Sequence, residues 1–168
     1  MYVFTMLMLL FYVGNDRYAL ESKLVIEVIP KVELKKLHNA PNYMPGLFNY
    51  RNRLVPVIDL CHLIGGHPCS SHLSTRIILV NYQGETALSL QETLPENYLA
   101  PTSHTKILGL MAERITGTLR KQETELFDSG IQVDAAPYLG EMIADGQGMI
   151  QCIHVEHLLP DSQKKFYF

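Results

Sequence analysis

The sequence has little of what usually reveals a function. It holds only three cysteines among 168 residues, an odd number at uneven spacing, which argues against a disulfide framework and favours a reducing cytoplasm. Lysine and arginine total 14 against 17 aspartates and glutamates, and they are scattered, so the formal net charge is −3. That balance provides no basic footprint for nucleic acid or for an anionic membrane.

Catalytic motifs are missing as well. The chain contains no Gly-x-Ser-x-Gly, no His-Glu-x-x-His and no phosphate-cradling glycine loop. Gly146 and Gly148 belong to a predicted hairpin turn, because no Lys-Ser/Thr pair and no helix follow them. We therefore expect a binding module with no catalytic residue and no cofactor.

The apolar run at the start of the chain, Met1 to Val13, is too short to cross a bilayer as a helix. It also lacks the basic flank and the small-residue cleavage site of a secretory signal. Because Gly14-Asn15-Asp16 ends the run and another apolar stretch follows, we interpret it as a buried hairpin strand and expect no membrane insertion.

A central hairpin is the clearest local prediction. Leu47–Tyr50 and Arg53–Ile58 form its arms, and Arg51-Asn52 occupy a tight turn that requires positive φ, which asparagine tolerates. The turn places the Arg51 guanidinium at a rigid tip with little of its own domain to pack on. Pro56 removes one amide donor, so we expect this arm at a sheet edge or a bulge.

The rest of the chain, 47% apolar, predicts a mostly β protein of short strands between turn signals. Asp59 is a predicted N-cap of a short helical turn and Gly65 its left-handed C-terminal residue, while Pro160 should end a last helical turn. Residues 83–105 are interpreted as a long loop. The other predicted strands are 7–13, 17–20, 24–29, 76–81, 107–112, 118–121, 139–144 and 149–153.

One internal repeat supports two subdomains. Val57–Ile64 aligns with Cys152–Leu159, and each follows a predicted hairpin. Both stretches consist of a strand, one helical turn and a stop.

Thiol and imidazole groups concentrate at Cys61, His62, His67, Cys69 and His72, and such ligands suit Zn²⁺. Their spacing matches no standard zinc motif, so a polar loop beside a buried cysteine is favoured over a metal site. The third cysteine, Cys152, lies in an apolar strand and is expected to be a small core residue.

Several motifs, in order, resemble the CheW family of bacterial chemotaxis coupling proteins and the matching regulatory domain of the kinase CheA. They are Tyr18-Ala-Leu, Val25-x-Glu-Val, Asn39-Ala-Pro-x-Tyr-x-x-Gly46, Asn49-x-Arg51 and Val55-Pro-Val-x-Asp-Leu60. The family's usual glycine after the hairpin arginine is replaced by Asn52. Against the family, the 83–105 stretch resembles an insertion.

The resemblance implies one domain over 1–168, built from two intertwined five-stranded SH3-like β-barrels with short helical turns and a shared core. The first barrel would comprise roughly residues 14–75 and the second roughly 76–153, with the chain ends crossing between them.

The resemblance also implies a non-enzymatic adaptor that links the cytoplasmic tip of chemoreceptors to the regulatory domain of a CheA-type histidine kinase. It would be cytoplasmic and recruited to membrane receptor arrays. An accessory or pathway-specific scaffold of the same family is an alternative, and a small metal-binding protein is another. The implied protein-binding residues are Val25, Glu27, Gly46, Arg51 and Asn52. From the residues alone, strand alternation would expose one of Val25 and Glu27 and bury the other, and Gly46 would admit a partner backbone or permit positive φ.

Overall fold

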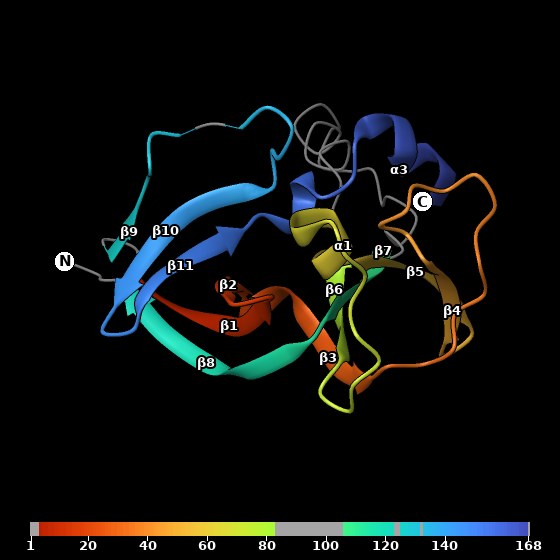
Figure 1. Cartoon of the computed structure of the whole chain (residues 1–168), viewed down its shortest axis with the longest axis horizontal. Coiled ribbons are helices and arrows are strands. Elements are labelled where there is room, and N and C mark those ends of the chain that lie inside the picture. Colours follow the sequence, from red (N-terminus) through yellow and green to blue (C-terminus); the bar gives the residue numbers. More distant parts are fainter. Residues whose placement is uncertain (1–3, 83–105, 123–124, 132, 168) are drawn as a thin grey trace, which may run out of the picture.

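Two β-sheets form the molecule, as the computed structural model shows for residues 4–82, 106–122, 125–131 and 133–167 (Figure 1). The strand order is β8-β1-β2-β11-β10-β9 in the six-stranded sheet and β3-β6-β7-β5-β4 in the five-stranded sheet. The strands are β1 (Thr5–Val13), β2 (Asp16–Glu21), β3 (Val25–Pro30), β4 (Gly46–Tyr50), β5 (Arg53–Asp59), β6 (Arg76–Tyr82), β7 (Lys106–Ala112), β8 (Arg114–Gln122), β9 (Leu126–Phe127), β10 (Leu139–Asp145) and β11 (Gly148–Ile153). In the described ranges, short helices connect or follow them: η1 (Ser22–Leu24), α1 (Leu60–Gly65), η3 (Val155–His157) and α3 (Asp161–Tyr167).

The prediction of a mostly β fold with two small barrel-like sheets is confirmed. One sheet has a sixth strand because the two-residue β9 pairs with β10.

The expected boundary near residue 75 does not separate the sheets: β6 and β7 lie with β3–β5, while β1 and β2 lie with β8–β11. Parallel pairing of β5 with β7 and of β2 with β11 brings together strands that are distant in sequence. A local residue pattern contains no information about such partners.

Both faces of β1 are buried, which explains its almost continuous apolar sequence. Met8 faces a small cluster within the six-stranded sheet, together with Ala19 and Ile143. Phe11 and Val13 face the other way, into the larger cluster that also contains the inner residues of the five-stranded sheet. The two sheets therefore share a core through β1 and β2, and the strand interpretation of residues 5–13 is confirmed. No helix in the described part of the chain has the length and apolar character to cross a membrane.

The internal repeat has a structural counterpart. In each sheet a hairpin strand, β5 or β11, leads directly into a short helical turn, α1 or η3. The equivalent residues Asp59 and His154 each donate a backbone N–H to a tyrosine carbonyl, Tyr43 and Tyr138 respectively, and both distances are 2.8 Å. The same connection is thus built twice.

The edge position predicted for Pro56 is wrong, because β5 is an inner strand between β7 and β4. Pro56 lies opposite Leu47, whose N–H and C=O bond to Lys35 at 2.9 and 2.8 Å and not to β5. At such a non-hydrogen-bonded pair both backbones point outward, so the proline nitrogen faces away from β4. It also precedes the stretch of β5, from Val57 to Asp59, that pairs with β7.

Three smaller expectations also change. The left-handed residue that ends α1 is Gly66, with φ of 77°, and not Gly65. The helical turn η3 ends before Pro160 as expected, but it is not the last, because the helix α3 follows at Asp161. Strand β8 begins at Arg114, so the turn after β7 is shorter than expected. The predicted loop at 83–105 lies outside the described residues.

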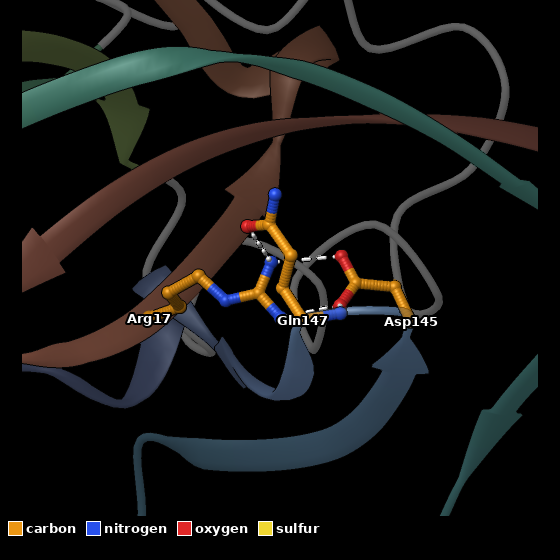
Figure 2. A network of polar contacts seen from close by, with 3 residues as sticks. All are labelled: Arg17, Asp145 and Gln147. Atoms are coloured by element: carbon orange, nitrogen blue, oxygen red, sulfur yellow. Dashed lines mark hydrogen bonds and ion pairs between the residues drawn. The ribbon is translucent and has the colours of Figure 1, made fainter.

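A polar network joins the start of β2 to the turn between β10 and β11 (Figure 2). The Arg17 guanidinium donates to both carboxylate oxygens of Asp145, at 2.7 and 2.5 Å, and lies 3.5 Å from Gln147 Oε1. Asp145 also accepts the Gln147 backbone N–H at 2.9 Å. These donors, with Arg17 the larger influence, lower the pKa of Asp145 to about 2. The bidentate pair ties together segments 128 residues apart.

Candidate protein-binding site at the central hairpin

The central hairpin has the geometry that the sequence predicts. Tyr50 pairs with Arg53 across a two-residue turn, in which Arg51 and Asn52 have φ of 49° and 65°. The Asn52 backbone N–H donates to Asn49 Oδ1 at 2.8 Å, which supports the turn from the preceding strand. Positive φ at both central residues matches the twist of the two arms, so the tip is rigid.

Arg51 is 76% exposed, yet it is not isolated at the tip as expected. Its guanidinium carbon lies 5.1 Å from the centre of the Tyr50 ring, within reach of a cation–π contact. Its Nη2 is 3.5 Å from Glu27 Oε2, a long contact between exposed groups that adds little stability. The guanidinium is therefore oriented but remains largely available to solvent.

Tyr50 is the residue that sequence reasoning missed. Its hydroxyl donates to Glu27 Oε2 at 2.5 Å and so connects β4 and β3, the two edges of the five-stranded sheet. This contact brings the edges together in the manner of a closing barrel. The hydrogen bond to Glu27 raises the pKa of the Tyr50 phenol, because the carboxylate stabilises the protonated form. Only the spatial approach of the two edges reveals this role.

The expected contrast between Val25 and Glu27 is wrong. Both are half-buried in β3, and a register shift between them in the pairing of β3 with β6 interrupts the regular strand period. Val25 packs against the main core, whereas the Glu27 side chain is 42% exposed and faces Arg51 and Tyr50. The outward positions of this edge strand are Ile26 and Val28, at 43% and 38% exposure.

Gly46 has an internal reason to be glycine. A Cβ built there would lie 2.4 Å from the carbonyl oxygen of Lys35 and 3.0 Å from the Leu34 Cβ. The close approach allows Lys35 and Leu47 to exchange two backbone hydrogen bonds. Gly46 is buried and is not among the residues with positive φ. It thus admits a segment of its own chain beside β4.

The five cysteines and histidines considered as zinc ligands, residues 61, 62, 67, 69 and 72, do not come together as one group. Cys61 and Cys69 are joined by a disulfide, a pairing that the argument against a disulfide framework did not anticipate. In the described part of the chain, the candidate metal-ligand group is Asp59, Cys61 and Cys69, and it includes none of the three histidines. His67 and His72 lie exposed in the loop after α1. Cys152 is buried and unpaired, as expected of a core residue.

At the hairpin, then, Arg51, Glu27 and Tyr50 come together, with Asn52 shaping the turn. Gly46 lies at the base of β4, and Val25 is turned toward the core. A guanidinium, a carboxylate and outward aliphatic side chains on a rigid edge are suited to non-covalent recognition of another protein.

Comparisons with known proteins agree with this architecture. The chain is 23% identical over 116 residues to the chemotaxis protein CheW of Helicobacter pylori, covering 69% of this chain and 58% of that protein. It is 28% identical over 74 residues to the chemotaxis protein CheW of Klebsiella aerogenes, covering 44% and 45%. The chain thus spans about half the length of the curated relatives it matches. The crystal structure of the scaffolding protein TtCheW from Thermoanaerobacter tengcongensis matches with a TM-score of 0.73 at 19% identity, covering 95% of this chain and 90% of that one, a likeness of fold.

Two small β-barrels that share a core and present a charged hairpin define the class: a double-barrel β protein. A family model described as a CheW-like domain matches residues 7–163, nearly the whole chain. The chain belongs to the CheW-like domain family.

Proposed function

We propose that this chain is a non-enzymatic adaptor that couples chemoreceptors to a CheA-type histidine kinase in bacterial chemosensory signalling. The observation that carries the proposal is the family match over residues 7–163. The names of the relatives, chemotaxis protein CheW, and the description of the structural neighbour as a scaffolding protein support it. The adaptor would act in the cytoplasm, where it would be recruited to membrane receptor arrays.

The binding residues we propose are Val25, Glu27, Gly46, Arg51 and Asn52, in three different roles. Arg51 and Glu27 would contact the partner directly, because both side chains are substantially exposed. Asn52 would set the hairpin tip that presents Arg51, while Val25 and Gly46 would support the edges from within. The contact between Arg51 and Glu27 is long and exposed, so exchanging it for a partner carboxylate or carbonyl costs the protein little.

Coupling in this proposal is geometric. The adaptor would hold the kinase regulatory domain and the receptor tip on two surfaces of one rigid body. A small displacement of the receptor would then reach the kinase without any chemical step.

The test is to measure binding of Arg51→Ala to a receptor cytoplasmic fragment and to a kinase regulatory domain, each by calorimetry. A guanidinium that makes two charge-assisted hydrogen bonds at a desolvated contact contributes as much binding free energy as a typical interface anchor residue. We expect the affinity for at least one partner to fall tenfold or more, which is about 1.4 kcal/mol. Arg51→Lys should restore the charge and part of the affinity, because the ammonium lacks the planar fork.

Arg120→Ala is the matched control, since Arg120 is an exposed arginine on β8 of the other sheet. It should leave both affinities unchanged. Wild-type protein that binds neither partner would contradict the adaptor proposal. Unchanged binding by Arg51→Ala would remove the hairpin tip from the interface while leaving the adaptor role in place.

A further inference from the structure

The Cys61–Cys69 pair anchors an exposed loop to the helix α1. Both cysteines are buried, at 4% and 7% exposure, and their Cα atoms are 5.2 Å apart, within the usual range for a disulfide. Residues 65–68 before Cys69 and residues 71–74 after it are exposed, while Ser70, next to Cys69, is half-buried. We call residues 66–75 the clamp loop, because Cys69 fastens its middle to the protein.

Non-covalent contacts hold the two cysteines in place independently of the bond. The Asp59 carboxylate is 2% exposed and accepts the His62 N–H that begins α1 at 3.0 Å and the Cys69 N–H at 2.9 Å. The next residue, Ser70, donates its N–H to Glu113 at 3.0 Å. One carboxylate therefore positions the backbone on both sides of the sulfur pair. Reduction would leave the sulfurs within reach of each other.

The reduced form also has a hydrogen-bond partner. The Cys69 sulfur lies 3.6 Å from the backbone carbonyl oxygen of Met111 in β7. A disulfide sulfur carries no hydrogen, whereas a thiol is a donor, so this carbonyl can accept from Cys69 only after reduction. A buried donor with an acceptor avoids most of the cost of desolvation. The surroundings thus accommodate both oxidation states.

We propose that Cys61 and Cys69 form a reversible thiol–disulfide site that restrains the clamp loop when it is oxidised. The oxidant would be a low-molecular-weight disulfide of the glutathione class. One cysteine thiolate attacks a sulfur of that disulfide, breaks its S–S bond and releases one thiol. The other cysteine, deprotonated, then attacks the mixed disulfide, forms the Cys61–Cys69 bond and releases the second thiol. The protein loses two electrons and two protons, which the small disulfide gains.

The site is independent of the adaptor proposal, because neither cysteine is among the proposed binding residues. The clamp loop presents Leu73 at 94% exposure. Restraining the loop reduces the number of conformations in which this apolar side chain is displayed. Cys152 is an internal reference, because burial in β11 raises the pKa of its thiol to about 12 and leaves little thiolate to react.

The experiment equilibrates the full chain at a series of reduced-to-oxidised glutathione ratios, quenches it with acid, unfolds it and alkylates the free thiols for peptide mass analysis. At the oxidising end we expect one alkylated cysteine, Cys152, and at the reducing end all three. Since the bond closes a loop with a sequence separation of 8, reduction should lower the melting temperature by about 5–10 °C with a cooperative transition retained. Proteolysis within the clamp loop should be faster in the reduced protein.

Matched cysteine variants show which thiols cause the dependence of the melting temperature on reductant. Cys152→Ser should keep the dependence of the melting temperature on reductant, and the double variant Cys61→Ser/Cys69→Ser should lose it. Three free thiols at every glutathione ratio would overturn the proposal, as would loss of cooperative unfolding on reduction of the wild type. One equivalent of zinc bound with Cys61 and Cys69 protected from oxidation would also overturn it, in favour of a metal site with Asp59. Equal rates of clamp-loop proteolysis in the oxidised and the reduced protein would contradict the claim that the disulfide restrains the loop.

Discussion

Gly46→Ala tests whether this glycine supports the fold or a partner contact. The added Cβ would meet backbone atoms of Lys35, the carbonyl oxygen at 2.4 Å and the carbonyl carbon at 2.9 Å. Backbone cannot rotate away as a side-chain end can, so residues 34 and 35 must move. That movement breaks or weakens the two hydrogen bonds between Lys35 and Leu47, at 2.8 and 2.9 Å.

The cost follows from these contacts. Two backbone hydrogen bonds contribute about 1 kcal/mol each. Forcing a methyl group into a filled site costs about 1–3 kcal/mol, while alanine returns about 0.4–1 kcal/mol by restricting the unfolded chain. The net loss in the free energy of unfolding is about 2–4 kcal/mol. For a chain of this size, that lowers the melting temperature by roughly 5–15 °C.

Calorimetric melting of Gly46→Ala beside Gly146→Ala provides the measurement. Gly146 lies in the turn between β10 and β11, where a Cβ would meet no heavy atom of the described residues within 4 Å, so its variant should melt at the wild-type temperature or slightly above it. Equal melting temperatures for Gly46→Ala and wild type would refute the steric argument. Weakened partner binding by a Gly46→Ala protein that is fully folded at the assay temperature would instead support a contact role.

Three further outcomes are expected. Asn52→Gly should be tolerated, whereas Asn52→Val should lose about 1–2 kcal/mol of stability in denaturant unfolding because a β-branched residue is strained at φ of 65°; equal stability of the two would contradict the turn assignment. Glu27→Gln should lower the pKa of the Tyr50 phenol toward its ordinary value in an NMR titration of labelled tyrosine, and an unchanged pKa would mean that their hydrogen bond does not form in solution. Asp145 has a folded pKa of about 2, below the ordinary value of 3.8 for this side chain, so its contribution to stability is complete above pH of about 4 and is lost as the pH falls toward about 2. Asp145→Asn should remove this part of the acid dependence, and the same pH profile for both proteins would count against the Arg17–Asp145 pair.

Sequence and structure agree best where a few adjacent residues determine the outcome. The central hairpin is local: two apolar arms and an Asn at a position of positive φ specify Tyr50 opposite Arg53 without reference to any other segment. The N-cap at Asp59 is local for the same reason, because its carboxylate bonds the backbone three residues on. The family resemblance rests on such stretches, and it led to the correct fold class.

Predictions failed where the decisive neighbour is distant in sequence. The contrast expected between Val25 and Glu27 is one example, because a register shift against β6 lies between them and the partners of Glu27 are 23 and 24 residues away, at Tyr50 and Arg51. The fit of Gly46 depends on Lys35, which belongs to a segment with no regular strand of its own.

By itself, then, the sequence determined most of the strands, their tight turns, the short helical turn after Asp59 and the family of the protein. Tertiary structure alone decided that β6 and β7 complete the five-stranded sheet, that Cys61 bonds Cys69, that Arg17 pairs with Asp145 and that Tyr50 connects the two edges of that sheet through Glu27. The physical reason is the distance along the sequence over which each kind of interaction acts. Turn and cap preferences arise from backbone sterics and hydrogen bonds among neighbours, whereas strand partners and side-chain pairs depend on how the whole apolar core is buried.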